Sequence, residues 1–181
     1  MAIEKVIAQA YIDGYCDGCK DSKEDGHIAV NDSKTEFVDL GLPSGTLWAT
    51  DYEKSDNGER LYVPYGKTAG LKLPTKEQWE ELCSCCEHST DSDDLTTFVG
   101  PNGNILTFEA TGWINASIIE SEHIMNFWME TDSYNNDNKR NYVYICNEYN
   151  VITGSIKNTC LGIDKTFSGY KLPVRLVQCK Q

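Results

Sequence analysis

The chain is poor in several residue types, and each shortage excludes a class of protein. None of its apolar runs approaches the roughly 20 residues that a helix needs to cross a bilayer, so we expect no membrane span. It has 16 Lys and Arg against 28 Asp and Glu, which gives a net charge of -12. Binding to phosphates needs clustered cations, so we expect no nucleic-acid partner, and an anionic membrane surface is equally disfavoured.

Two further absences concern export and catalysis. Residues 1–6 lack the basic-then-apolar order of a signal peptide, which predicts synthesis in the cytoplasm without export. His27, His88 and His123 have no Cys, Ser or Asp partner in a recognisable motif, so no nucleophile or general base is predicted. We therefore expect a protein that is not an enzyme.

Cysteine, in contrast, is plentiful, with eight residues. A secreted chain with an even count would suggest disulfides, but the missing export signal favours thiols. Cys16 and Cys19 have the spacing of zinc ligands, and residues 83–88 could supply more. Cys83 and Cys86 also fall on the apolar face of a predicted helix, where cysteine packs as a small hydrophobe. We favour core packing and predict no metal and no cofactor.

The length and the 40% apolar content predict one compact domain with a short appendage. The appendage is a helix over residues 1–20, followed by a polar linker over 21–35 and a domain over 36–181. The residues on one face of this N-terminal helix recur at steps of three and four and form an apolar stripe. They are Ile3, Val6, Ile7, Ala10, Tyr11, Gly14 and Tyr15. An isolated helix of this length is marginal in water, so the stripe must dock. It could dock on its own domain, on copies of itself, or in a groove of a larger assembly.

The body of the domain reads as mixed α and β. Residues 36–40 alternate like a half-buried strand, a turn follows at 41–45, and a second strand runs through Leu47 and Trp48. The polar residues 51–60 predict a turn or an exposed loop. Thr75 and Gln78 form a capping box that starts a helix with Trp79, Leu82, Cys83 and Cys86 on its apolar face. The polar run 87–94 ends this helix and is expected to stay hydrated.

Two β-prone runs, 96–99 and 105–108, flank the sequence GPNGN and predict a hairpin. The most promising contact surface follows in residues 131–150, which combine tyrosine with asparagine as recognition loops do. The candidate contact residues are Tyr134, Asn135, Asn136, Asn138, Arg140, Asn141, Tyr142 and Tyr144. An alternative for part of this segment is a strand in which Tyr142, Tyr144 and Cys146 share one face.

Four signatures occur in order: DLGLPSGTLWA at 39–49, LPTKEQWEELC at 73–83, GPNGN at 100–104 and VRLV at 174–177, with FW at 127–128. Together they resemble the Fibrobacter-succinogenes major paralogous domain family, which is abundant in Bacteroidetes and their phages. The resemblance implies an α+β, C-type-lectin-like domain with short mixed and antiparallel sheets and one or two helices, here preceded by the N-terminal helical segment. It also implies a final strand over 168–177 in which Arg175 binds a buried carboxylate or backbone carbonyls.

The chain departs from related patterns at several points. Sugar-binding C-type lectins hold calcium with Glu-Pro-Asn or Gln-Pro-Asp and a Trp-Asn-Asp strand, whereas Gly100 precedes Pro101 and Asn102 here. We therefore expect a plain turn at 100–104. Leu176 stands where the family has proline, and YVPYG at 62–66 is a short counterpart of a longer family stretch.

Three function classes follow from these observations. The favoured one is a noncatalytic phage virion surface protein, a head fibre or decoration protein. It would be a homo-oligomer, dimer or trimer, that attaches to a capsid or other virion protein through its N-terminus. Its loops would contact a host surface glycan or protein. The alternatives are a bacterial surface or secreted binding module, and an enzyme like the formylglycine-generating enzymes, whose motif context is missing.

Overall fold

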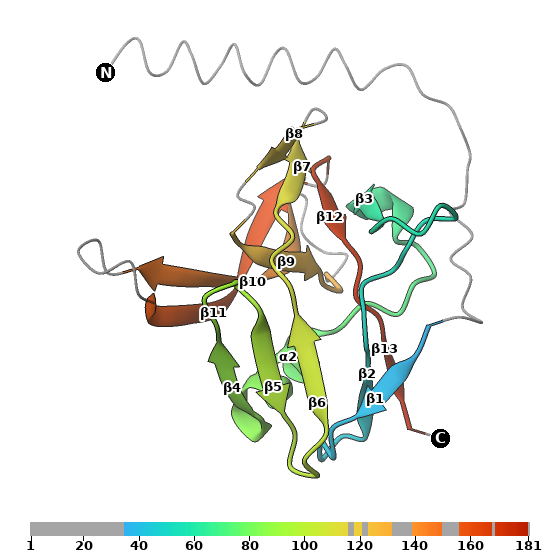
Figure 1. The fold of residues 1–181 in the computed structure, drawn as a ribbon. Helices are drawn as coiled ribbons and strands as arrows, with labels where there is room; N and C mark the ends of the chain where they lie inside the picture. The colour runs from blue at the N-terminus through green and yellow to red at the C-terminus, as the bar shows by residue number, and fades with distance from the viewer. Residues whose placement is uncertain are drawn as a thin grey trace, which may run out of the picture.

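The computed structural model describes residues 35–115, 118–120, 123–131, 139–149, 156–167 and 169–180. Within these residues short strands form four small sheets around one α-helix (Figure 1). The described part is therefore a mixed, sheet-rich α+β fold, as predicted. The predicted N-terminal helix and all but the last residue of the predicted linker lie outside the described residues.

The first sheet joins the beginning of the domain to its end. It has the order β1-β2-β13, with β1 at Phe37–Asp39, β2 at Thr46–Ala49 and β13 at Val177–Cys179. Both pairs are antiparallel. The two strands predicted on either side of the 41–45 turn are confirmed, and β13 closes the domain by pairing with the second of them (Figure 1).

The second sheet has the longest strands. Its order is β11-β10-β9, with β9 at Met125–Trp128, β10 at Lys139–Tyr149 and β11 at Ile156–Phe167. Because β10 lies between its two antiparallel partners, its backbone is paired on both sides. The strand alternative for Tyr142, Tyr144 and Cys146 is thus confirmed.

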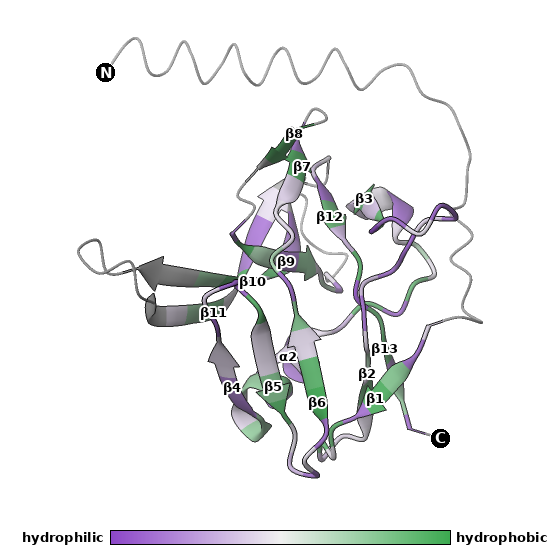
Figure 2. Cartoon of the chain, in the orientation of Figure 1, coloured by the Kyte–Doolittle hydropathy of each residue, from purple (hydrophilic) through white to green (hydrophobic). Residues whose placement is uncertain are grey.

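The third sheet contains the predicted hairpin and one strand that the sequence pattern did not predict. Its order is β4-β5-β6, with β4 at Glu87–Thr90, β5 at Thr96–Val99 and β6 at Ile105–Phe108. The hairpin has its predicted bounds. Strand β4 is hydrophilic and mostly exposed (Figure 2), so this part of the polar run stays hydrated as predicted, whereas Asp94 at the end of the run is buried. Backbone pairing with β5 makes the first four residues of the run a strand.

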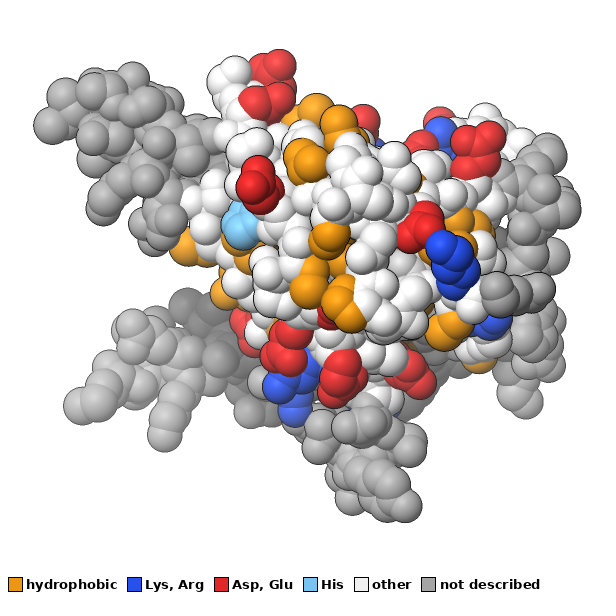
Figure 3. Space-filling model, turned by 90° about the horizontal axis from the view of Figure 1, so that it is seen from below, with side chains coloured by type: hydrophobic (Ala, Val, Ile, Leu, Met, Phe, Trp, Pro, Cys, Tyr) orange, Lys and Arg blue, Asp and Glu red, His pale blue; other side chains and the backbone are white. Residues whose placement is uncertain are grey.

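The turn of this hairpin lies at the lower end of the molecule in Figure 1. There Val99 and Ile105 are directly opposite each other and are 36% and 57% exposed. The view from below shows apolar side chains exposed among uncharged, acidic and basic ones (Figure 3). This end of the molecule is therefore neither uniformly polar nor basic.

The fourth sheet has the order β3-β12-β7-β8. Its strands are β3 at Tyr62–Pro64, β12 at Lys171–Pro173, β7 at Trp113–Asn115 and β8 at Ile118–Glu120. The expectation of one continuous final strand over 168–177 is wrong. The chain leaves the fourth sheet after Pro173 and enters the first at Val177, because the buried residues 174–176 cross the core between the two sheets.

Arg175 lies in this crossing and explains why the crossing is stable. Its buried guanidinium donates hydrogen bonds to the carbonyl oxygens of Ala49, Thr50 and Thr107, at 2.8, 2.9 and 3.0 Å. It also lies over the ring of Tyr52, 4.8 Å from its centroid. A buried charge needs such partners, and the backbone-carbonyl role predicted for Arg175 is confirmed.

The helix α2 spans Lys76–Cys85 and is preceded by a 3-10 helix, η1, at Tyr65–Lys67. Thr75 is the N-cap, and both hydrogen bonds of the predicted capping box are present. Trp79 and Leu82 are buried. Local signals thus placed this helix correctly.

The core is aromatic and ties α2 to three of the sheets. Trp79 lies edge-on to Trp48, Phe98, Phe108 and Phe127, with ring centroids 5.9 to 6.4 Å apart. Each such pair contributes about 0.5 to 1.5 kcal/mol beyond the area that it buries. None of the described helices is long and apolar enough to cross a membrane.

Candidate functional site

The predicted contact residues fall into two groups. Tyr134, Asn135, Asn136 and Asn138 lie outside the described residues. Arg140, Asn141, Tyr142 and Tyr144 all belong to β10. The described part of the predicted surface is therefore the first half of a central strand, directly after residues 132–138.

The two tyrosines of this group are partly structural. Tyr142 lies opposite Trp128 and lines a small cavity of about 40 Å³ with Trp113, Thr166, Tyr170 and Leu172. Burial raises the pKa of the Tyr142 phenol. Tyr144 lies over Gly162, where an added Cβ would come within 2.6 Å of its ring. Both rings are thus half-buried on one face of the sheet and offer part of their area to solvent.

Arg140 lies beside a hollow in the described surface, which we call the Arg140 groove. Its volume is about 930 Å³. Five segments line it: η1 with the loop that follows, the start of α2, the exit of β9, the start of β10, and β13. Its lining includes Tyr65, Lys72, Glu130, Thr131, Arg140, Cys179 and Lys180.

An aromatic platform holds Arg140 in place. Its guanidinium carbon is 5.5 Å from the centroid of the Tyr65 ring. That ring is packed edge-on against Trp128 at 5.5 Å, and its hydroxyl accepts a hydrogen bond from the Thr131 amide at 3.1 Å. Cation–π contact and these supports leave the guanidinium little freedom, so the groove presents a positioned planar donor.

The chain around Arg140 is also fixed by backbone hydrogen bonds. The Asn141 amide donates to Thr131 Oγ1 at 2.9 Å, and the Met129 amide donates to the Asn141 carbonyl at 3.2 Å. Glu130 is tied to the loop before α2, because its amide donates to the Pro74 carbonyl at 3.0 Å. These hydrogen bonds therefore hold residues 129–131 and the start of β10 in place.

The described residues that line the groove differ in charge from the chain as a whole. They include Lys72, Arg140 and Lys180 and one acidic residue, Glu130, whereas the chain carries -12. Lys180 also pairs with Asp39 at 2.7 Å, but its side chain stays 64% exposed. Since cations are scarce in this sequence, their grouping here is a local property that distinguishes the groove.

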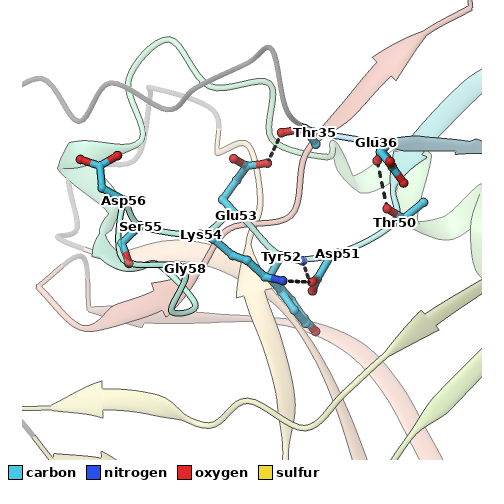
Figure 4. Close-up of a pocket in the computed structure, with 10 residues that line it drawn as sticks. All are labelled: Thr35, Glu36, Thr50, Asp51, Tyr52, Glu53, Lys54, Ser55, Asp56 and Gly58. Atoms are coloured by element: carbon cyan, nitrogen blue, oxygen red, sulfur yellow. Dashed lines mark hydrogen bonds and ion pairs between the residues drawn. The ribbon is translucent and has the colours of Figure 1, made fainter.

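A second hollow, of about 460 Å³, lies beside β1 and the 50–58 loop (Figure 4). Among the described residues that line it, the acidic ones are Glu36, Asp51, Glu53 and Asp56, and Lys54 is the single cation. Two of the carboxylates are engaged: Glu53 accepts from the Thr35 hydroxyl at 2.8 Å and Asp51 pairs with Lys54 at 2.7 Å. The described residues contain no group of three or more His, Cys, Asp or Glu side chains that could hold a metal ion.

The loop over 51–60 is only partly the exposed loop that its composition predicts. Its turn is present, closed by a bridge between Lys54 and Arg60. Tyr52 and Glu53, however, are buried. Tyr52 packs between Arg60 and Arg175, at 4.9 and 4.8 Å from its ring centroid, and burial raises the pKa of its phenol. Contacts with Arg60, at the end of the same loop, and with Arg175 thus keep Tyr52 buried in the domain.

The cysteines of α2 behave as the core-packing interpretation predicts. Burial raises the pKa of the Cys83 thiol to about 12 and that of Cys86 to about 11. Metal ligation and nucleophilic attack both use the thiolate, which burial disfavours at these two positions near neutral pH. Cys16 and Cys19 lie outside the described residues.

The 100–104 segment is the plain turn that was predicted. The side-chain amides of Asn102 and Asn104 both donate to the Asp39 carbonyl at 2.8 Å. The Asn102 side-chain oxygen accepts from the Asn104 amide at 3.0 Å. These contacts fasten the hairpin turn to the end of β1.

No family model, curated protein or solved structure matches this chain. The site must therefore be argued from its own residues. Sequence reasoning found Arg140 but missed Tyr65, Lys72 and β13, because nothing local marks them as neighbours of Arg140. The one sequence feature that could have indicated Tyr65 is the aromatic YVPYG run at 62–66.

Proposed function

We propose that this chain is a noncatalytic binding module with a C-type-lectin-like fold, and that its ligand contacts the Arg140 groove and the start of β10. The observation that carries the proposal is the placement of Arg140. It is held over Tyr65 beside a groove of about 930 Å³, at the start of β10. Contact residues that a rigid scaffold positions are the usual arrangement of recognition domains.

We further propose that the module is displayed on a phage virion surface, attached through residues 1–20. The resemblance to the Fibrobacter-succinogenes major paralogous domain family supports this setting, as does the docking stripe of the N-terminal segment. A bacterial surface or secreted binding module is the second candidate, supported by the same family resemblance. The raised thiol pKa values of Cys83 and Cys86 weigh against chemistry like that of the formylglycine-generating enzymes.

Binding of the fluorescently labelled, full-length protein to intact Bacteroidetes cells tests the binding function. We expect saturable binding that Arg140→Ala weakens at least about fivefold, because a positioned charge-assisted contact contributes 1.5 to 3 kcal/mol. The matched control is Lys165→Ala, an exposed cation on β11 outside the groove. Periodate treatment of the cells removes glycan ligands and protease treatment removes protein ligands, so the two treatments separate these classes.

Equal binding by Arg140→Ala and Lys165→Ala would contradict the assignment of the groove. Absence of saturable binding to a panel of such cells would contradict the proposed host contact.

A further inference from the structure

The small cavity beside Tyr142, which we call the Tyr142 cavity, has room for one small chemical group. Its volume is about 40 Å³, and its described lining residues are Trp113, Tyr142, Thr166, Tyr170 and Leu172. Leu172 is buried and the other four are partly exposed, so the cavity reaches from the surface to the core. Pockets that enclose a whole small molecule have volumes of about 300 to 1,000 Å³. A ligand can therefore insert only a part of itself here.

The Tyr142 cavity adjoins the surface on which the proposed binding function rests. Tyr142 follows Arg140 by two residues in β10, and residues two apart in a strand have their side chains on the same face. Thr166 of β11 is directly opposite Arg140. The cavity and Arg140 are therefore neighbours on one face of the second sheet.

The lining of the cavity combines aromatic rings with hydroxyl groups. The rings of Trp113, Tyr142 and Tyr170 offer apolar area against which a methyl group packs well. Tyr142 and Thr166 also bring hydroxyls, and neither hydroxyl has a hydrogen-bond partner among the described residues. None of the described lining residues is charged.

This lining distinguishes between kinds of small group. A charged group would lose its hydration without gaining an ionic partner from the lining residues. A purely aliphatic group would cover the two hydroxyls and leave them without hydrogen bonds. An acetamido group avoids both penalties, because its methyl packs against the rings and its carbonyl oxygen accepts a hydrogen bond from a hydroxyl.

The surface next to the cavity has groups that suit a sugar ring. Asp164 is exposed and lies directly opposite Tyr142. Its carboxylate accepts a hydrogen bond from the Lys165 amide at 2.7 Å, and a carboxylate has acceptor sites for several more donors. Sugar hydroxyls are such donors, and the C–H groups of a sugar pack on the exposed part of a tyrosine ring.

We infer that the Tyr142 cavity binds the acetamido group of an N-acetylated amino sugar. This inference rests on the proposed binding function and names the class of ligand. The sugar ring lies on the exposed part of Tyr142, and its hydroxyls donate to Asp164. An acetylated lysine carries the same acetamido group, but the amino sugar is favoured because only it has hydroxyls for Asp164.

Ligand-observed NMR titration of the full-length protein with matched sugars tests the inference. The probes are the methyl glycosides of N-acetylglucosamine and N-acetylgalactosamine, each compared with the glucose or galactose glycoside that has a hydroxyl in place of the acetamido group. We expect at least one acetylated sugar to bind at least about tenfold more tightly than its counterpart, because a hydroxyl leaves the aromatic part of the cavity unfilled. Saturation transfer should be strongest at the acetyl methyl protons.

Variants of the two hydroxyl residues locate the site. Thr166→Val and Tyr142→Phe keep the shape of the cavity and remove one hydroxyl each, so at least one of them should weaken the acetylated sugar about three- to tenfold. Thr97→Val is the matched control, since Thr97 is also a half-buried strand threonine but lies in β5, away from the cavity. Circular dichroism checks that each variant is folded.

Equal affinities within both sugar pairs overturn the inference, and so does a folded pair of hydroxyl variants that bind as Thr97→Val does. Tighter binding of an acetylated-lysine peptide than of either acetylated sugar would also overturn it, in favour of a protein ligand. If Arg140-dependent binding to cells persists in these cases, the binding function stands and only the ligand class is wrong. If the acetylated sugar binds but cells do not, the ligand class stands and the proposed host contact fails.

Discussion

At the scale of single residues, Gly100 shows how one side chain would disturb the domain. It begins the turn of the β5–β6 hairpin, and a Cβ built on it would lie 2.2 Å from the carbonyl oxygen of Leu40 and 2.8 Å from its Cα. These atoms belong to the backbone after β1, which cannot rotate away as a side chain would. The hairpin and the first sheet therefore touch at a point where only glycine fits.

We predict that Gly100→Ala lowers the free energy of unfolding by at least about 2 kcal/mol, because overpacking forces backbone shifts. Urea denaturation followed by circular dichroism measures this difference. Gly66→Ala is the matched control, since a Cβ there meets nothing within 4 Å. Equal midpoints for the two variants would mean that the turn and β1 are farther apart than described.

A second prediction concerns the carboxyl group of Asp39. Its pKa is held below its ordinary value by a hydrogen bond from Lys180, at 2.7 Å, and by another from the Gly41 amide, at 2.9 Å. A lowered pKa in the folded state stabilises the fold above the unfolded pKa of about 3.9, and this contribution is lost as the pH falls through the folded value. Lys180 is exposed and Asp39 is partly exposed, so salt screens the pair and weakens the effect.

We expect NMR titration to find a low pKa for Asp39 in the unmodified protein and a higher one in Lys180→Gln. Lys54→Gln, which removes an exposed lysine paired with Asp51 instead, should leave the titration of Asp39 unchanged. If the pKa of Asp39 is the same in the unmodified protein and in Lys180→Gln, the ion pair at the end of β13 does not form in solution.

At the scale of elements, the local signals were accurate where a few adjacent residues determine the structure. The capping box of Thr75 and Gln78 placed α2, and two β-prone runs around an Asn-Gly turn placed β5 and β6. Strand β4 was missed because its side chains are polar and exposed, and its pairing with β5 involves backbone groups that every residue has. The final strand was predicted as one element because nothing local shows that Arg175 must turn into the core.

The register of β10 against β11 gives an element-scale prediction. Cys146 and Cys160 are directly opposite each other. Such pairs have Cα atoms about 4.5 to 5.5 Å apart, within the 4.4 to 6.8 Å that disulfides span. We predict that oxidised glutathione links these two thiols, with two glutathione thiols as the reduced product, and that peptide mapping finds this crosslink first.

Cys160→Ser should abolish the crosslink, whereas Cys83→Ser should not, because burial keeps the Cys83 thiol protonated. If peptide mapping finds Cys146 or Cys160 linked to a different cysteine first, β10 and β11 have a different register. A shift of one residue would move Cys146 to the opposite face from Cys160.

At the scale of the whole molecule, the domain is closed by contacts between its two ends. β13 pairs with β2, and the Arg140 groove is built from segments as far apart as Tyr65 and Lys180. No spacing rule links such residues in a sequence. This is why Arg140 was predicted as a contact residue from the tyrosine and asparagine around it, while the groove beside it was not.

The apolar stripe of residues 1–20 predicts self-association or attachment of the full-length chain. We expect light scattering to give the mass of a dimer or trimer for the full-length protein and of a monomer for a version that begins at Asn31. Circular dichroism of the shorter version checks that the domain remains folded. A monomer in both cases would contradict self-association through this segment, leaving docking on its own domain or on a different partner.

The sequence by itself determined the mixed α and β class, the helix after Thr75 and the β5–β6 hairpin. These depend on short-range patterns. Only the tertiary structure decided that Tyr52 is buried between two arginines, that Cys146 lies opposite Cys160, and that Lys72, Arg140 and the edge of β13 share one groove. The reason is that such contacts join distant segments, and their geometry is set by how sheets and helix pack rather than by neighbouring residues.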